Sequence, residues 1–166
     1  MTSISIDRHD NLVTGAFARI LHTLLATDRS ALLTLLRITL GLVILPHGLQ
    51  KAFGWFGGYG FTGTMGFFGS IGIPAFLGFL SIAAESAGAL ALIAGVTTRI
   101  AAFGLIVNML VAASMHRANG FFMNWTGQQK GEGIEFHILF VAIAVVILIA
   151  GAGRWSIDRA ITAKKG

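Results

Sequence analysis

The chain has 166 residues, of which 55% are hydrophobic and only 11% are charged. Soluble domains carry about 25% charged residues, so this composition excludes an ordinary soluble domain and indicates a membrane protein. The net charge of +5 does not indicate nucleic-acid binding, because the basic residues mostly flank apolar runs instead of forming a patch. The chain also has no cysteine, which excludes a dithiol active site, a thiolate-held iron–sulfur cluster and disulfides.

Residues 1–30 are predicted to form a cytoplasmic segment that precedes the first membrane span. Within residues 12–26, the apolar side chains follow helical spacing at Phe17, Ile20, Leu21, Leu24 and Leu25. Polar side chains lie off this stripe, so the pattern fits an amphipathic helix in the membrane interface. A frayed polar tail is an equal alternative for this segment.

Four apolar segments predict four transmembrane helices, at residues 31–49, 74–95, 100–115 and 134–151. A membrane span needs about 20 mostly apolar residues, and lipid offers no water to an open backbone, so these spans should be helical. The predicted fold is therefore all-α, with a bundle of four transmembrane helices over residues 31–153. A basic cytoplasmic tail over residues 154–166 is expected to follow it.

The first outer loop, residues 53–73, alternates glycines with aromatic residues and carries no charge. We expect it to lie at the level of the lipid headgroups, partly re-entrant or as a short flat helix. Two interpretations remain open. The loop is either an interfacial lid without a ligand, or one wall of a site for a flat, lipid-soluble ligand such as a quinone. The aromatic residues are Trp55, Phe56, Tyr59, Phe61, Phe67 and Phe68.

The distribution of lysine and arginine predicts the orientation of the spans. Cytoplasmic loops carry an excess of these residues. In a four-span arrangement one side holds eight of them, namely Arg8, Arg19, Arg29, Arg99, Arg154, Arg159, Lys164 and Lys165. The other side holds three, Lys51, Arg117 and Lys130. Both termini are therefore expected in the cytoplasm, with the chain in a bacterial-type inner membrane.

Two charged residues lie inside predicted spans, Arg37 in the first and Glu85 in the second. A charge within hydrocarbon costs at least a few kcal/mol without a partner, so such residues are functional candidates by default. Glycine and serine residues flank both positions and would allow the two helices to approach closely. We expect Arg37 and Glu85 to meet, either as a structural ion pair or as a proton-transfer group with its counter-ion.

A second group of polar residues is expected at the outer ends of the spans. It consists of His47, Lys51, His116, Glu135 and His137. Histidines there could ligate a metal or a haem, hydrogen-bond a quinone carbonyl or relay protons, although each also has an ordinary interfacial role. No metal-ligand spacing motif is present, which favours a shared polar site over a metal or haem site. Asn108, in the middle of the third span, is expected to make an interhelical hydrogen bond.

Several segments of the sequence resemble the DoxX family of small four-helix membrane proteins. They are LLRITLGLVILPHGLQKAFG at 35–54, AAESAGALALIAGVTTRIAA at 83–102, HRANGFFMNW at 116–125, GEGIEFHIL at 131–139 and GAGRWSIDRAI at 151–161. The resemblance implies a four-helix membrane bundle. It also implies that the recurrent polar positions of the family are Arg37, His47, Lys51, Glu85, Arg99, His116 and Glu135.

The resemblance implies several functions, because family members differ. Some look like components of quinone-linked oxidoreductases, including a subunit of an archaeal thiosulfate–quinone enzyme, and others are linked to oxidative-stress assemblies. The leading hypothesis is a membrane redox component that binds a quinone or a similar apolar ligand and works with a protein partner. Catalytic roles are expected for Glu85 and Arg37, and a structural role for Arg99.

The principal alternative is a non-enzymatic membrane anchor or assembly subunit of a larger complex. A small bundle with short loops would suit that role, because helix faces can dock other helices. Glycine-lined faces would also allow a homo-oligomer. A transporter is a weaker third hypothesis, since neither paired broken helices nor an internal repeat is apparent.

Overall fold

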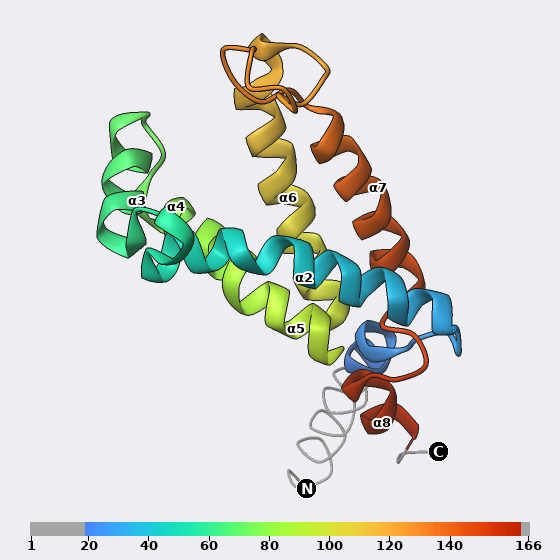
Figure 1. Ribbon diagram of the computed structural model, residues 1–166. Helices are drawn as coiled ribbons and strands as arrows, with labels where there is room; N and C mark the ends of the chain where they lie inside the picture. Colours follow the sequence, from blue (N-terminus) through green and yellow to red (C-terminus); the bar gives the residue numbers. More distant parts are fainter. Residues whose placement is uncertain (1–18, 164–166) are drawn as a thin grey trace, which may run out of the picture.

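The computed structural model describes residues 19–163, and within them every regular element is helical (Figure 1). This confirms the all-α prediction. Residues 19–25 are helical, whereas the rest of the expected interfacial helix lies outside the described residues. The main elements are α2 (Ala31–Phe53), α3 (Gly60–Ser70), α4 (Ala75–Ala83), η2 (Ala84–Gly88), α5 (Ala89–Ala94), α6 (Thr98–His116), α7 (Glu135–Ala150) and α8 (Ile157–Ala163).

Local capping residues fix the limits of the first span. The Ser30 side chain accepts a hydrogen bond from the backbone N–H of Leu33 at 3.4 Å, which satisfies one of the free donors at the start of α2. Gly54 follows the helix with a φ of 74°, a left-handed conformation that glycine adopts readily. Between these two signals, α2 is 23 residues long and can cross a bilayer.

The second span, Ala75–Ala94, is a continuous helix in three parts, because α4 and α5 are joined by the π-helical turn η2. A π turn adds a residue to one helical turn and so rotates the side chains that follow it; such turns often occur at functional sites. Glu85 lies inside η2 and is buried. The irregular turn therefore coincides with the acidic residue of this span.

Three helices are long and apolar enough to cross a membrane: α2, the α4–η2–α5 helix, and the helix that runs from α6 to Asn119. The fourth, α7, has 16 residues and would be about 24 Å long at 1.5 Å per residue, slightly short of a typical hydrocarbon core. The structure thus contains the four expected apolar helices, and the last of them is shorter than the others. The chain is a multi-pass membrane protein.

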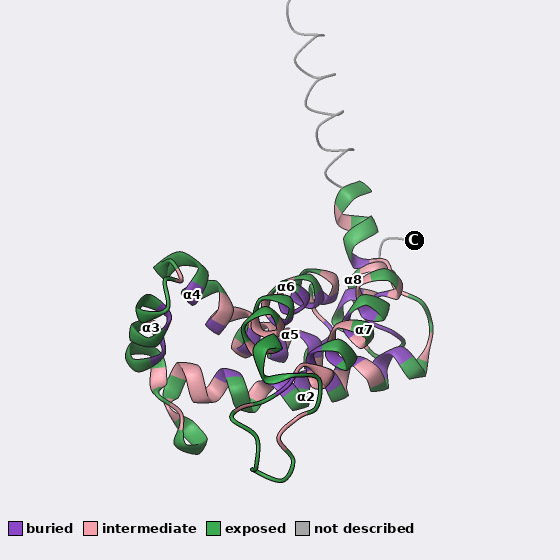
Figure 2. Cartoon of the chain, turned by 90° about the horizontal axis from the view of Figure 1, so that it is seen from above, coloured by how far each residue is buried: buried purple, intermediate pink, exposed green. Residues whose placement is uncertain are grey.

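The helices pack in two main pairs around one core. α6 packs along α7, while α2 crosses them and packs against α5 and η2 (Figure 1). Buried residues face the interior of this arrangement, and the outward faces are largely exposed (Figure 2). Those outward faces are apolar, which is the arrangement that a lipid environment requires. The central buried residues are Leu40, Ile44, Ala89, Leu92, Leu105, Phe140 and Ala144.

The aromatic loop that follows α2 contains a short 3₁₀ turn, η1 (Trp55–Gly57), followed by the helix α3. The expected short helix is therefore present. Thr64 and Phe68 are its buried residues, and the Phe68 ring lies against Gly78 of α4. α3 is attached to the bundle through these few contacts with α2 and α4.

Candidate functional site

A buried carboxylate, an ammonium group and an amide meet where three helices cross. Glu85 of η2 is only 3% exposed. Its Oε2 forms an ion pair with Nζ of Lys51 from α2, and its Oε1 accepts a hydrogen bond of 2.7 Å from Nδ2 of Asn108 in α6. Both carboxylate oxygens therefore have a partner. We refer to these three residues as the Glu85 site.

Two features of the backbone bring these side chains together. Gly48, one turn before Lys51, lies directly against the Glu85 backbone, so α2 and η2 approach more closely than a side chain would allow. Thr64 of α3 donates a hydrogen bond of 3.3 Å to the Lys51 carbonyl and holds the outer end of α2 against α3.

The Glu85 site is open at one corner. The Lys51 side chain is 29% exposed, whereas the Glu85 side chain is 4% exposed. An ammonium group has three donors and Glu85 engages Lys51 through one contact, so Lys51 keeps donors for a further partner. The arrangement therefore presents a buried carboxylate with a partly exposed cation beside it.

The expected pairing of Arg37 with Glu85 is wrong. The Arg37 guanidinium donates instead to backbone carbonyls: to Ala152 at 2.7 Å, to Leu92 and Ile93 at 2.5 Å each, and to Trp155. These carbonyls belong to the last turn of α5 and to the segment after α7, where helix ends leave acceptors free. Carbonyl dipoles therefore satisfy this charge, so it needs no carboxylate. Glu85, further along its helix, pairs with Lys51.

Arg99 and Asp158 complete this polar end of the bundle, which we call the Arg37 end. Arg99 donates to the carbonyls of Leu148 and Ile149 at 2.6 Å, near the end of α7. Asp158 of α8 accepts hydrogen bonds from the backbone N–H groups of Thr97 at 2.7 Å and Thr98 at 2.9 Å, and so caps α6. Sequence reasoning missed Asp158; its only signal was its place in the closing GAGRWSIDRAI segment.

Of the remaining residues of the expected outer cluster, the structure brings His116 and His137 together. His47 is exposed on α2. The rings of His116 and His137, at the outer ends of α6 and α7, lie with their centroids 5.3 Å apart. Glu135 accepts hydrogen bonds from the Met123 N–H at 3.0 Å and from Trp125 Nε1 at 2.8 Å, so it holds the loop between α6 and α7. Within the described residues, no hydrogen bond or ion pair joins these groups to Lys51.

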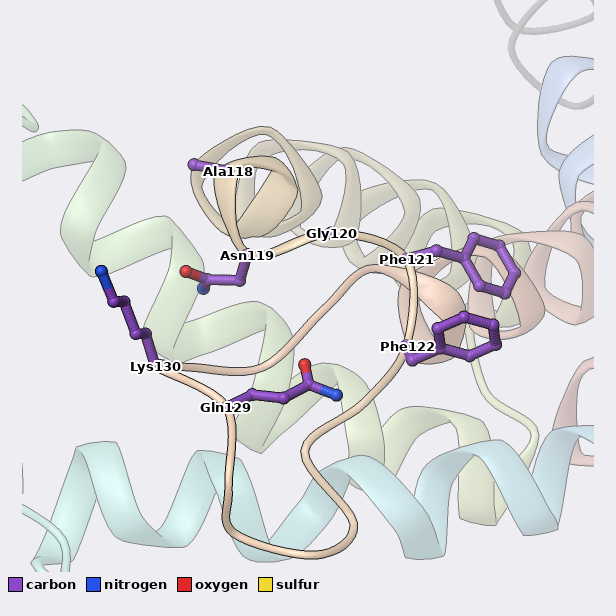
Figure 3. Close-up of a pocket in the computed structure, with 7 residues that line it drawn as sticks. All are labelled: Ala118, Asn119, Gly120, Phe121, Phe122, Gln129 and Lys130. Atoms are coloured by element: carbon purple, nitrogen blue, oxygen red, sulfur yellow. The ribbon is translucent and has the colours of Figure 1, made fainter.

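The loop between α6 and α7 encloses a pocket of about 370 Å³. Figure 3 shows the Phe121 and Phe122 rings on one side and Lys130 on the other. This pocket includes none of the residues of the Glu85 site. Within residues 19–163, no group of three or more His, Cys, Asp or Glu residues could hold a metal ion. The residues that line the pocket between α6 and α7 are Ala118, Asn119, Gly120, Phe121, Phe122, Gln129 and Lys130.

Comparison with known proteins identifies the family. The sequence model of the DoxX family matches residues 32–124, more than half of the chain. The chain belongs to the DoxX family. No curated protein and no solved structure matches it. The matched range of this DoxX protein contains Arg37 and all three residues of the Glu85 site, whereas Glu135, His137 and Asp158 lie beyond it.

Proposed function

We propose that this DoxX protein is a membrane redox component that binds the polar head of a quinone, or of a similar apolar redox ligand, at the Glu85 site. The observation that supports this most is the buried Glu85 carboxylate within a membrane span, paired with Lys51 and Asn108. Ionisable groups at such depth are costly and generally serve a ligand or a proton pathway. The ligand roles expected for His47, His116, Glu135 and His137 do not enter the proposal, because within the described residues no hydrogen bond or ion pair joins them to the Glu85 site.

The residues of the site suit a quinone head in chemical type. The free donors of Lys51 would hydrogen-bond a carbonyl oxygen, and the second hydrogen of the Asn108 amide offers another donor. Glu85 would accept or supply a proton. A bound quinone supplies a reversible reaction of two electrons and two protons. The aromatic segment around α3 lies next to this corner and would cover an apolar ring.

The electrons would come from, or go to, a partner protein. The chain has no cysteine for a thiolate-bound iron–sulfur cluster.

We further propose a bacterial-type inner membrane with both termini in the cytoplasm. Arg29, Arg99, Arg154 and Arg159 all lie near the Arg37 end, and cytoplasmic loops are rich in such residues.

Purification tests the proposal. The protein would be isolated in mild detergent, its visible spectrum recorded, and its extract analysed for quinones and metals. We expect a stoichiometric quinone, which Glu85→Gln abolishes together with quinone-coupled turnover while the variant still elutes as a folded protein. Glu132→Gln, a change to an exposed carboxylate of the outer loop, is the matched control and should retain the quinone. Normal turnover by folded Glu85→Gln would refute a proton-transfer role.

The second candidate is a non-enzymatic anchor or assembly subunit. It is favoured by the large apolar side chains exposed along α4, α6 and α7, which could pack against helices of another membrane protein as well as against lipid. Isolation of the protein with stable partners but without quinone or chromophore would support this function over the redox proposal.

A further inference from the structure

We propose that Glu85 exchanges protons only with the side of the membrane on which α2 ends at Phe53, and not with the side of the Arg37 end. The inference rests on the proposed function, in which Glu85 carries protons. It adds a direction: turnover would take up or release its protons on one face of the membrane. Three features of the bundle carry it.

The first feature is an apolar layer between Glu85 and the Arg37 end. Its residues come from α2, α5 and α6, are each 4% exposed or less, and lie along these helices between the Arg37 end and the residues of the Glu85 site or the turn η2. Leu92 borders the Arg37 end, because its carbonyl accepts a hydrogen bond from Arg37. Water needs polar partners to occupy a protein interior, and this layer offers none through its side chains. Protons therefore have no hydrogen-bonded route through it. The layer consists of Leu40, Ile44, Ala89, Leu92 and Leu105.

The second feature is the closure of the Arg37 end itself. Arg37 is 1% exposed and donates to four carbonyls from two separate segments, so each of its three guanidinium nitrogens has a partner. Asp158 is equally buried and joins α8 to the start of α6. Beside them, a Cβ atom at Gly95 would lie 2.6 Å from the Ser156 side chain, so the segments pack without space there. Among residues 19–163, no titratable side chain joins this end to Glu85 through hydrogen bonds or ion pairs.

The third feature is the open corner at Lys51. Its ammonium group touches the Glu85 carboxylate, and its side chain is 29% exposed, against 4% for Glu85. Lys51 lies in the last turn of α2, where a lysine reaches the membrane surface with its charged head. One polar side chain therefore spans the distance from Glu85 to the aqueous interface on this side, while five apolar residues separate Glu85 from the other.

Single-cysteine labelling tests this directly, because the natural chain has no cysteine and each variant carries one thiol. Asn108→Cys and Glu85→Cys would be reconstituted in liposomes and exposed, from either side, to a membrane-impermeant cationic methanethiosulfonate. Gln129→Cys marks the side of the outer loop, and Arg154→Cys marks the side of the Arg37 end. Leu92→Cys, in the apolar layer, is the buried control. Size-exclusion profiles confirm which variants fold.

We expect Asn108→Cys and Glu85→Cys to react from the same side as Gln129→Cys, at least about tenfold faster than from the side of Arg154→Cys, because a charged reagent does not cross an apolar layer readily. Reaction from the Arg154 side, from both sides equally, or from neither side in a folded variant would overturn the inference. The readout is independent of redox activity. A protein that labels as expected but binds no quinone would refute the proposed function and leave the one-sided access intact.

Discussion

Gly48 of α2 lies so close to Glu85 that a Cβ atom on it would be 2.3 Å from the Glu85 carbonyl oxygen. Gly48→Ala must therefore push α2 away from η2 and draw Lys51 away from the carboxylate. We expect this variant to lower the free energy of unfolding by about 1–3 kcal/mol, the usual cost of overpacking a filled interior. Thermal unfolding in detergent measures the loss.

Gly104→Ala is the matched control for Gly48→Ala. Gly104 also lies in a membrane helix, but its nearest contact for a Cβ atom is the Ala84 side chain at an ordinary 3.9 Å. We expect this change to be neutral or slightly stabilising, because alanine favours a helix over glycine. Equal stability of both variants would show that α2 and η2 do not approach as closely as described.

The Lys51–Glu85 pair predicts a strongly non-additive double mutant. Lys51→Met leaves the Glu85 carboxylate buried without its cation, which should cost about 1–3 kcal/mol of stability because a buried polar group has lost a partner. Adding Glu85→Gln removes that charge and should restore most of the loss. The double variant is therefore expected to be more stable than Lys51→Met alone. If the stability change of the double variant equalled the sum of the two single changes, the two groups would not interact.

Hydropathy predicted the four apolar helices, and the glycines of the first span predicted its close approach to the second, because both follow from local composition. The pairing of Glu85 with Lys51 did not follow from local composition. The rotation of each helix decides which side chains meet, and the π turn at Ala84–Gly88 changes that rotation within the second span. Periodicity read from the sequence assumes a regular helix, so it gave no sign that Glu85 would face Lys51.

The predicted pairing of Arg37 with Glu85 was wrong for a second physical reason. The sequence suggests charged partners for a charged residue, but it does not reveal which backbone carbonyls the fold brings within hydrogen-bonding distance of that residue. Those of Leu92, Ile93, Ala152 and Trp155 converge on Arg37 only once α5, α7 and the segment before α8 are in place. For the same reason, Asp158 could not be recognised as the cap of a helix 60 residues away in the sequence.

Arg37 should therefore behave as a stability residue. Arg37→Gln removes a guanidinium that donates to four carbonyls, among them the buried acceptor of Ala152, and a buried acceptor that loses its partner costs about 1–3 kcal/mol. We expect a loss of several kcal/mol, and Arg37→Lys should recover only part of it because an ammonium group lacks the planar set of donors. Arg154→Gln, at an exposed position, is the control and should change thermal stability little. A fully stable Arg37→Gln variant without turnover would instead make Arg37 part of the chemistry.

Glu135 holds the loop between α6 and α7 in place, so removing its carboxylate should destabilise that loop. Its Oε1 holds both the Met123 N–H and Trp125 Nε1, so Glu135→Ala releases two contacts at once. Hydrogen bonds to a carboxylate contribute about 1.5 kcal/mol or more, enough to raise the open fraction of the loop about tenfold. Trypsin should then cleave after the exposed Lys130 correspondingly faster, as measured by mass spectrometry of the purified protein.

Trp125→Phe separates the two contacts of Glu135. It removes only the indole hydrogen bond and keeps the backbone one from Met123, so cleavage after Lys130 should lie between the wild type and Glu135→Ala. Glu135 lies on α7, far from the Glu85 site in the sequence and unconnected to it by hydrogen bonds among the described residues, so quinone content should be the same in both variants. Loss of quinone on loop release would instead show that the pocket between α6 and α7 contributes to the ligand site.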